Sequence, residues 1–270
     1  MKTIKTLETS LVSLDCTSFR VPFRLSADSR AVLAKMMERA PFGTQTSTHP
    51  RPDTRPFAVV RHRGDAYQLL SDGNIVTEAA ELQPILDRLA SDLMVHVANY
   101  APDRVFLHAG VVGWQGRALI FPGASFAGKT TLVAELVRAG ATYYSDEYAV
   151  LDQYGKVHPY ARDLQMRRNG AQAQTPVPVA HLNGTTGATP LPVSKVIFTR
   201  YVEFGHWAPE PVSSGMAVLE MLRHAIPVQR APARVMAVVA AMMESAVAVR
   251  SERGEASEAA CALLLVTADG

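Results

Sequence analysis

The sequence of 270 residues contains only two cysteines, Cys16 and Cys261, and no long apolar run. Two cysteines cannot build a disulfide framework or a thiolate metal cluster within one chain. The most apolar segment, Val235 to Met243, is far shorter than the roughly 20 residues that span a bilayer. The apolar core of a signal peptide is also missing from the amino-terminal MKTIKTLETSLVSLD. We therefore expect a protein of a reducing compartment, the cytoplasm, with no membrane partner.

A strong excess of charge of either sign is missing as well. The formal net charge is +2, with 48% hydrophobic and 19% charged residues, which is ordinary for a globular protein. This balance is too mild for a dedicated nucleic-acid surface, so we expect no nucleic-acid partner. One locally basic stretch is interpreted as a solvated strand and loop rather than as a binding patch; it contains Arg51, Arg55, Arg61 and Arg63.

Periodicity and turn residues predict an α/β protein with two parts. Residues 1–100 are interpreted as an N-terminal α/β subdomain and residues 101–270 as the functional core, although no linker marks the boundary. In the first part, candidate strands accompany a short capped helix, and a second helix follows Pro84 with its apolar residues at helical spacing. The second part is the better specified of the two.

In that second part, two apolar strands, RVFLHAGVVGW and RALIFPG, flank a turn at Gln115-Gly116. Residues 169–192 contain many breakers and predict a long loop. The segment 214–246 is rich in alanine and methionine and predicts helix, and the apolar ACALLLV (260–266) suggests a last strand.

The most specific feature is the stretch GASFAGKT, which matches G-x-x-x-x-G-K-[ST] at every fixed position. Glycines let the backbone curl so that its N–H groups point at an anion, and the following helix adds its positive end. A strand precedes the loop and an amphipathic helix ending at Gly140 follows it, so we interpret it as a nucleotide loop rather than an incidental turn. The predicted nucleotide-binding residues are Gly123, Ala124, Ser125, Phe126, Ala127, Gly128, Lys129, Thr130 and Thr131.

Hairpin geometry brings a histidine to this loop. If Gln115-Gly116 forms a two-residue turn, counting back along both strands places His108 opposite Gly123. A histidine there can take part in proton transfer, but a core histidine bonded to a backbone carbonyl would look the same in the sequence. Both interpretations stay open at this point.

Chain length brings carboxylates to the same place. A helix from Lys129 to Ala139 carries the chain roughly 16 Å away, and an extended return to Asp146 recovers about 15 Å. Asp146 is therefore a candidate general base hydrogen-bonded to His108, while Lys129 would neutralise charge on a phosphoryl group. The expected Mg²⁺ ligands are Thr130, Asp146 and Glu147. A solvated acidic turn is the alternative.

The stretch LHAGVVGWQGRALIFPGASFAGKTTLVAELVRAGATYYSDE resembles HPr kinase/phosphorylase, the bacterial enzyme that phosphorylates a serine of the carrier protein HPr. That family has a histidine, a glycine loop ending in Gly-Lys-Ser, a helix, a glycine and a pair of aspartates, in this order and spacing. The resemblance places the family's histidine and first aspartate on His108 and Asp146. Thr130 and Glu147 replace the loop serine and the second aspartate, and the family's glycine-rich signature further along has no counterpart here.

The resemblance implies a PEP-carboxykinase-like P-loop fold, with a mixed sheet and flanking helices. It also implies an ATP- and Mg²⁺-dependent kinase that transfers the γ-phosphoryl group to a serine-type hydroxyl of a peptide or small protein, similar to tailoring kinases of lasso-peptide precursors. The alternatives are a non-catalytic ATP-binding regulatory or assembly protein, a free-serine kinase and an ATP hydrolase, and a homo-oligomer is left open. Arg162, Arg167 and Arg168 could clamp phosphates or belong to an ordinary exposed strand.

Overall fold

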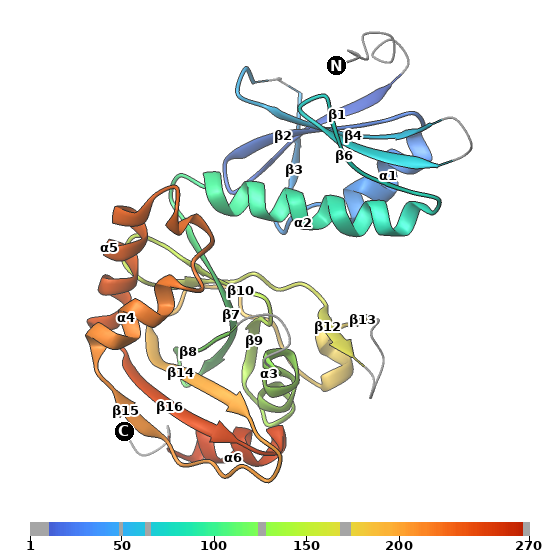
Figure 1. The fold of residues 1–270 in the computed structure, drawn as a ribbon. Helices are drawn as coiled ribbons and strands as arrows, with labels where there is room; N and C mark the ends of the chain where they lie inside the picture. Colours follow the sequence, from blue (N-terminus) through green and yellow to red (C-terminus); the bar gives the residue numbers. More distant parts are fainter. Residues whose placement is uncertain (1–10, 49–50, 63–65, 124–127, 168–173, 267–270) are drawn as a thin grey trace. The chain divides into compact units, whose positions relative to one another are not determined.

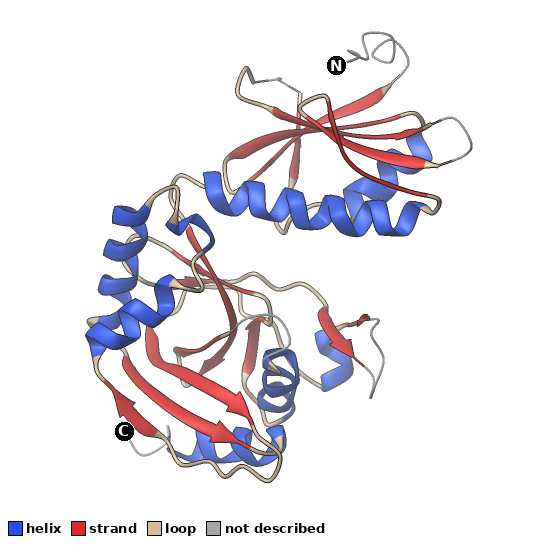
Figure 2. Cartoon of the chain, viewed as in Figure 1, coloured by secondary structure: helices blue, strands red, loops and turns tan. Residues whose placement is uncertain are grey.

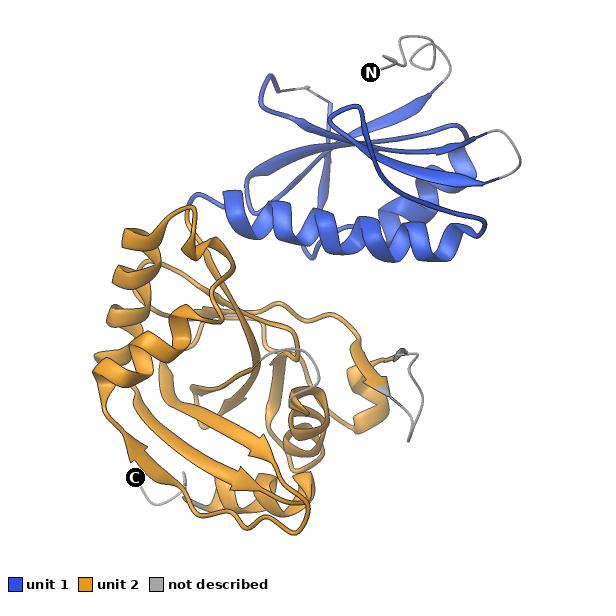
Figure 3. Cartoon of the chain, in the orientation of Figure 1, with its two compact units in different colours: residues 1–102 blue, residues 103–270 orange. Residues whose placement is uncertain are grey.

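The computed structural model describes residues 11–48, 51–62, 66–123, 128–167 and 174–266. The chain is a mixed α/β protein, as predicted, with sheets and helices along its whole described length (Figures 1 and 2). It forms two compact units, Met1–Pro102 and Asp103–Gly270 (Figure 3). In the described part of the chain, no helix is long and apolar enough to cross a membrane.

Unit 1 is a six-stranded sheet in the order β3-β1-β2-β4-β5-β6 with two helices. Its elements are β1 (Val12–Ser18), β2 (Val21–Ala27), α1 (Arg30–Glu38), β3 (Gln45–Ser47), β4 (Arg55–Arg61), β5 (Tyr67–Ser71), β6 (Asn74–Ala79) and α2 (Leu82–Tyr100). The side chain of Ser29 caps α1 by accepting a hydrogen bond from the Val32 N–H. The apolar face predicted after Pro84 is buried in α2, so both predicted helices of this unit are confirmed.

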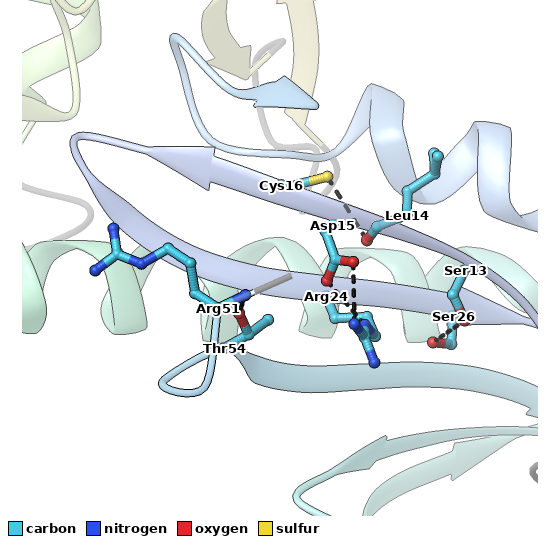
Figure 4. A network of polar contacts seen from close by, with 8 residues as sticks. All are labelled: Ser13, Leu14, Asp15, Cys16, Arg24, Ser26, Arg51 and Thr54. Atoms are coloured by element: carbon cyan, nitrogen blue, oxygen red, sulfur yellow. Dashed lines mark hydrogen bonds and ion pairs between the residues drawn. The ribbon is translucent and has the colours of Figure 1, made fainter. Parts of the chain in front are cut away.

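Polar side chains pair across and beside the strands of unit 1 (Figure 4). Arg24 Nε donates to Asp15 Oδ1 at 2.8 Å between directly opposed residues of β1 and β2. Arg51 pairs with Asp53 at 3.2 Å and Arg55 with Asp72 at 3.0 Å. These two arginines of the basic stretch therefore have acidic neighbours of their own, as expected of a solvated strand and loop.

Unit 2 contains an eight-stranded mixed sheet ordered β11-β10-β7-β8-β14-β16-β15, in which β9 pairs with β7 off this path. Its strands are β7 (Val105–Trp114), β8 (Arg117–Pro122), β9 (Thr142–Ser145), β10 (Tyr148–Leu151), β11 (Val157–His158), β14 (Val193–Tyr201), β15 (Glu210–Val212) and β16 (Val247–Arg253). A separate two-stranded sheet joins β12 (Leu164–Arg167) and β13 (Gln174–Val177). The helices are α3 (Lys129–Arg138), α4 (Ser214–Leu222), α5 (Pro232–Met243) and α6 (Ala256–Val266), with short 3₁₀ turns η1 (Val179–Leu182) and η2 (Ile226–Val228).

Both faces of this sheet are covered, which explains the continuous apolar run of β8. Ala118 and Ile120 belong to the core shared with α4 and α5, whereas Leu119 and Phe121 belong to the core shared with α3 and α6. A Cβ atom at Gly110 of β7 would lie 2.7 Å from a methyl carbon of Val133 in α3. This glycine therefore lets α3 pack directly against the centre of the sheet.

The structure corrects two predictions for the second half of the chain. Residues 260–266 are not a strand but part of α6, because Ala256, Ala260 and Leu263 recur at helical spacing and are buried. Residues 169–192 are not a single loop, since β13 and η1 lie within them. The helical prediction for 214–246 is confirmed by α4 and α5, with η2 and its Pro227 between them.

Candidate functional site

The glycine loop (residues 123–130) connects β8 to α3. Gly128 has φ of +74°, a left-handed conformation that favours glycine, and Lys129 begins the helix. The first turn of an α-helix presents backbone N–H groups that have no carbonyl partner within the helix, which suits an anion. Gly140 ends α3 with φ of +102°, as predicted. The predicted binding residues Ala124, Ser125, Phe126 and Ala127 lie outside the described residues, and Thr131 is exposed in the first turn of α3.

Lys129 bridges the two ends of the glycine loop. Its Nζ donates to the backbone carbonyl of Gly123 at 2.9 Å. Burial lowers the pKa of this ammonium, while the nearby carboxylates of Asp146 and Glu147 act in the opposite direction. The ammonium therefore lies beside the same carboxylates that the sequence placed at the loop.

His108 lies opposite Gly123, as the hairpin geometry predicts. Strands β7 and β8 pair from Trp114 with Arg117 to Ala109 with Pro122, and the Gly123 N–H donates to the His108 carbonyl at 3.2 Å. The imidazole ring lies 5.0 Å from the Tyr148 ring between centroids. Burial, together with Lys129 and His224, holds the pKa of His108 below its ordinary value. The ring is therefore uncharged at neutral pH.

Asp146 returns to the level of the glycine loop. The Thr130 hydroxyl donates to Asp146 Oδ2 at 2.9 Å, although most of α3 and all of β9 separate the two residues in sequence. The carboxylate is only 7% exposed. Two more donors reach it: the Tyr143 hydroxyl to Oδ1 at 2.9 Å and the Gln165 N–H to Oδ2 at 3.3 Å. A buried carboxylate requires such partners.

The hydrogen bond expected between Asp146 and His108 does not form. In the described part of the chain, the carboxylate accepts from three other donors, and the imidazole packs on Tyr148 instead. His108 reaches the loop from β7 and Asp146 from the bend between β9 and β10, but the two side chains do not constitute a hydrogen-bonded pair.

The oxygen atoms at this point fit Mg²⁺. The Thr130 hydroxyl and the Asp146 carboxylate lie side by side, and hard oxygen ligands of this kind hold Mg²⁺ together with phosphate oxygens and water. No group of three or more His, Cys, Asp or Glu residues that could hold a metal occurs within the described ranges. A metal here would therefore depend on phosphate and water for its remaining ligands.

Glu147 occupies the rim of the site beside Asp146. Its side chain reaches solvent, yet surrounding protein atoms desolvate the carboxyl and raise its pKa, while Arg162 acts in the opposite direction. The positive charge of Arg162 thus acts on Glu147. Of the other two arginines considered, Arg167 is the last residue of β12, and Arg168 lies outside the described residues.

Two buried side chains at the loop had no counterpart in the sequence analysis. Tyr143 is fully buried, and in the sequence it is only one of several aromatic residues in an apolar strand. Arg253 is 2% exposed and donates through Nη2 to the Gly128 carbonyl at 3.0 Å and through Nη1 to the Gly254 carbonyl at 3.2 Å. Without a prediction of β16, nothing in the sequence could have connected Arg253 to the glycine loop.

A pocket of about 480 Å³ lies beside the start of the glycine loop. It is at the carboxyl ends of the parallel strands β8, β14 and β16, where open α/β sheets bind ligands. A larger pocket, of about 660 Å³, belongs to unit 1 and contains no residue of the loop. The residues lining the smaller pocket are Pro122, Gly123, Phe198, Thr199, Arg200, Glu220, His224, Arg250, Ser251 and Glu252.

No family model matches the chain, and no curated protein matches it.

Proposed function

We propose that residues 103–270 form an ATP-dependent kinase domain that transfers the γ-phosphoryl group to a serine-type hydroxyl of a peptide or small protein. The fold proposed is the PEP-carboxykinase-like version of the P-loop fold. The observation that carries the proposal is the 2.9 Å hydrogen bond from the Thr130 hydroxyl to Asp146. It joins the last fixed residue of the loop motif to a buried carboxylate, the pair that holds Mg²⁺ in phosphate-loop enzymes.

The glycine loop and Lys129 would bind the phosphates. The N–H groups at the start of α3 and the Lys129 ammonium place positive charge where the phosphoryl group develops negative charge during transfer. Mg²⁺ held by Thr130 and Asp146 would supply further charge neutralisation. Tyr143 and the Gln165 N–H keep the Asp146 carboxylate in position.

His108 is the better supported acceptor of the hydroxyl proton. Both oxygens of Asp146 already accept hydrogen bonds, whereas the His108 imidazole is held uncharged, with a pKa below its ordinary value because of burial and the nearby Lys129. In the proposed step, the hydroxyl oxygen bonds to the γ-phosphorus and its proton passes to His108. The bond from that phosphorus to the bridging oxygen breaks, and ADP leaves.

The proposal is tested with γ-labelled ATP, Mg²⁺ and either serine-containing peptides or free serine, with thin-layer separation of the products. The His108→Asn variant should lose about 10²- to 10⁴-fold in transfer, the usual contribution of a proton-transfer group, while binding a fluorescent ATP analogue normally. Asp146→Asn should lose both transfer and the Mg²⁺ dependence of binding. Asp163→Asn, which changes an exposed aspartate of the same unit, is the matched control and should behave as wild type.

The same separation distinguishes the alternatives. Label found only in free phosphate, unaffected by any acceptor, would assign an ATP hydrolase. ATP binding without any labelled product would assign a non-catalytic nucleotide-binding protein. This outcome would agree with the absence of a hydrogen bond between Asp146 and His108 in the described part of the chain. Label in serine but not in peptides would assign a free-serine kinase.

A further inference from the structure

The pocket beside the glycine loop has no role in the phosphate chemistry described above. Its wall includes Gly123, the first residue of the loop, and the sheet edge beyond it. The nucleotide phosphates would lie over the loop amides and α3, whereas this pocket is lined by α4 and by the ends of β14 and β16. It is therefore a separate space that opens at the loop.

His224 connects the pocket to the proton acceptor. Its backbone carbonyl accepts a hydrogen bond from the backbone N–H of His108 at 2.8 Å, and its side chain lines the pocket. Burial is the main cause that lowers the pKa of both His108 and His224. The charge of Lys129 lowers both pKa values further. A hydroxyl bound in the pocket would thus be near Gly123, at the start of the loop, and next to His224, which neighbours His108.

The pocket presents charges of both signs in weak pairs. Arg200 pairs with Glu252, and Arg250 Nη2 lies 3.6 Å from Glu220 Oε2. Three of these four side chains are more than half exposed, Glu220 being the exception at 27%. Exposed ion pairs contribute little to stability, so a ligand that offers its own charges can replace either partner at small cost.

We propose that this pocket binds the phosphoryl acceptor, and that the acceptor is a peptide segment with one acidic and one basic residue beside the reacting hydroxyl. The acidic residue would be held by Arg200 or Arg250 and the basic residue by Glu220 or Glu252. This inference depends on the proposed kinase function. A volume of about 480 Å³ is within the range of sites that enclose small ligands, which suits a few residues of a peptide.

The test uses five synthetic peptides of equal length with one central serine. Their flanking residues are neutral, acidic, basic, acidic then basic, or basic then acidic. Transfer from γ-labelled ATP and fluorescence anisotropy of the labelled peptides, with and without ADP, are both measured. One of the two mixed peptides should be preferred over the neutral one by about two- to fivefold in kcat/KM, the value of an exposed charge pair.

Pocket variants then locate the binding site. Arg250→Gln and Glu220→Gln should each raise the KM for the mixed peptide by about two- to fivefold and leave the KM for ATP unchanged. Arg223→Gln is the matched control, because Arg223 also lies 3.6 Å from Glu220 but does not line the pocket. It should behave as wild type.

The outcomes separate this inference from the function on which it depends. If peptides bind and the pocket variants weaken that binding, but no label is transferred, the pocket proposal holds and the kinase proposal fails. If label is transferred to all five peptides equally and the pocket variants change nothing, the kinase proposal holds and the pocket proposal is refuted. A raised KM for ATP in Arg250→Gln would refute it too, by assigning the pocket to the nucleotide.

Discussion

Replacing Tyr143 with phenylalanine isolates one hydrogen bond at the centre of the candidate site. The ring of Tyr143 is fully buried, and its hydroxyl donates to Asp146 Oδ1 at 2.9 Å. Phenylalanine preserves the packing and removes only the hydroxyl donor. Asp146 Oδ1 then stays buried but loses this hydrogen bond. Burial and Asp146 both raise the pKa of Tyr143, so the phenol stays protonated and is a donor throughout the accessible pH range.

The size of the effect follows from the charge of the acceptor. A hydrogen bond to a charged group contributes about 1.5–3 kcal/mol. In a domain of this size, 1 kcal/mol moves the unfolding midpoint by about 2–4 °C, so Tyr143→Phe should lower the midpoint by roughly 3–12 °C. Both tryptophans, Trp114 and Trp207, lie in unit 2. Their fluorescence during thermal unfolding therefore reports on this unit.

Two other tyrosines provide controls for this measurement. Tyr144 is also buried, but its hydroxyl donates to a neutral acceptor, the Thr189 carbonyl, at 2.7 Å. Tyr144→Phe should cost less, about 0.5–1.5 kcal/mol. Tyr154 is 71% exposed, and its replacement should have no effect. If Tyr143→Phe destabilises the protein no more than Tyr154→Phe does, the charged hydrogen bond inferred at Asp146 is wrong.

Three further changes test other parts of the site. Gly128→Ala forces alanine into the left-handed region and toward the Arg253 guanidinium. It should lower the free energy of unfolding by at least about 1–2 kcal/mol and weaken binding of a fluorescent ATP analogue. Unchanged binding would contradict the loop geometry. Arg253→Met removes the donor to the Gly128 carbonyl and should weaken the same binding, whereas Arg200→Met, which changes an exposed arginine, should not. In the folded protein the pKa of His108 lies below the ordinary 6.5 that a histidine has in the unfolded chain. At a pH between the folded and the unfolded pKa, the unfolded chain therefore binds more protons than the folded one. The free energy of unfolding should therefore fall as the pH is lowered below about 6.5, and it should fall less steeply in His108→Gln. If the free energy of unfolding has the same pH slope in both proteins, the lowered pKa is refuted.

The parts of the site that depend on local geometry could be predicted from the sequence. The turn at Gln115-Gly116 sets the pairing of β7 with β8, so the position of His108 opposite Gly123 follows from counting. The length of α3 and the following strand likewise brings Asp146 to Thr130. These predictions needed only the rise per residue of a helix and of a strand.

What depends on contacts between distant segments could not be predicted. Strand β16 buries Ala248, Ser251 and Arg253, a set without the apolar alternation that marks a strand, and it is stabilised by parallel pairing with β14. The apolar run at 260–266 fits a buried strand as well as a buried helix, because a continuous run carries no period. The partners of Asp146 depend on side-chain directions that sequence spacing does not specify.

The hydrogen bond from Arg253 to the Gly128 carbonyl has a consequence for synthesis of the chain on the ribosome. Gly128 is synthesised more than a hundred residues before Arg253, and the guanidinium that donates to its carbonyl is positioned only once β16 has paired with β14. If the glycine loop binds nucleotide as proposed, we therefore expect that affinity to appear only after Arg253 has been synthesised and β16 has formed. A chain that ends before Arg253 would then bind ATP weakly.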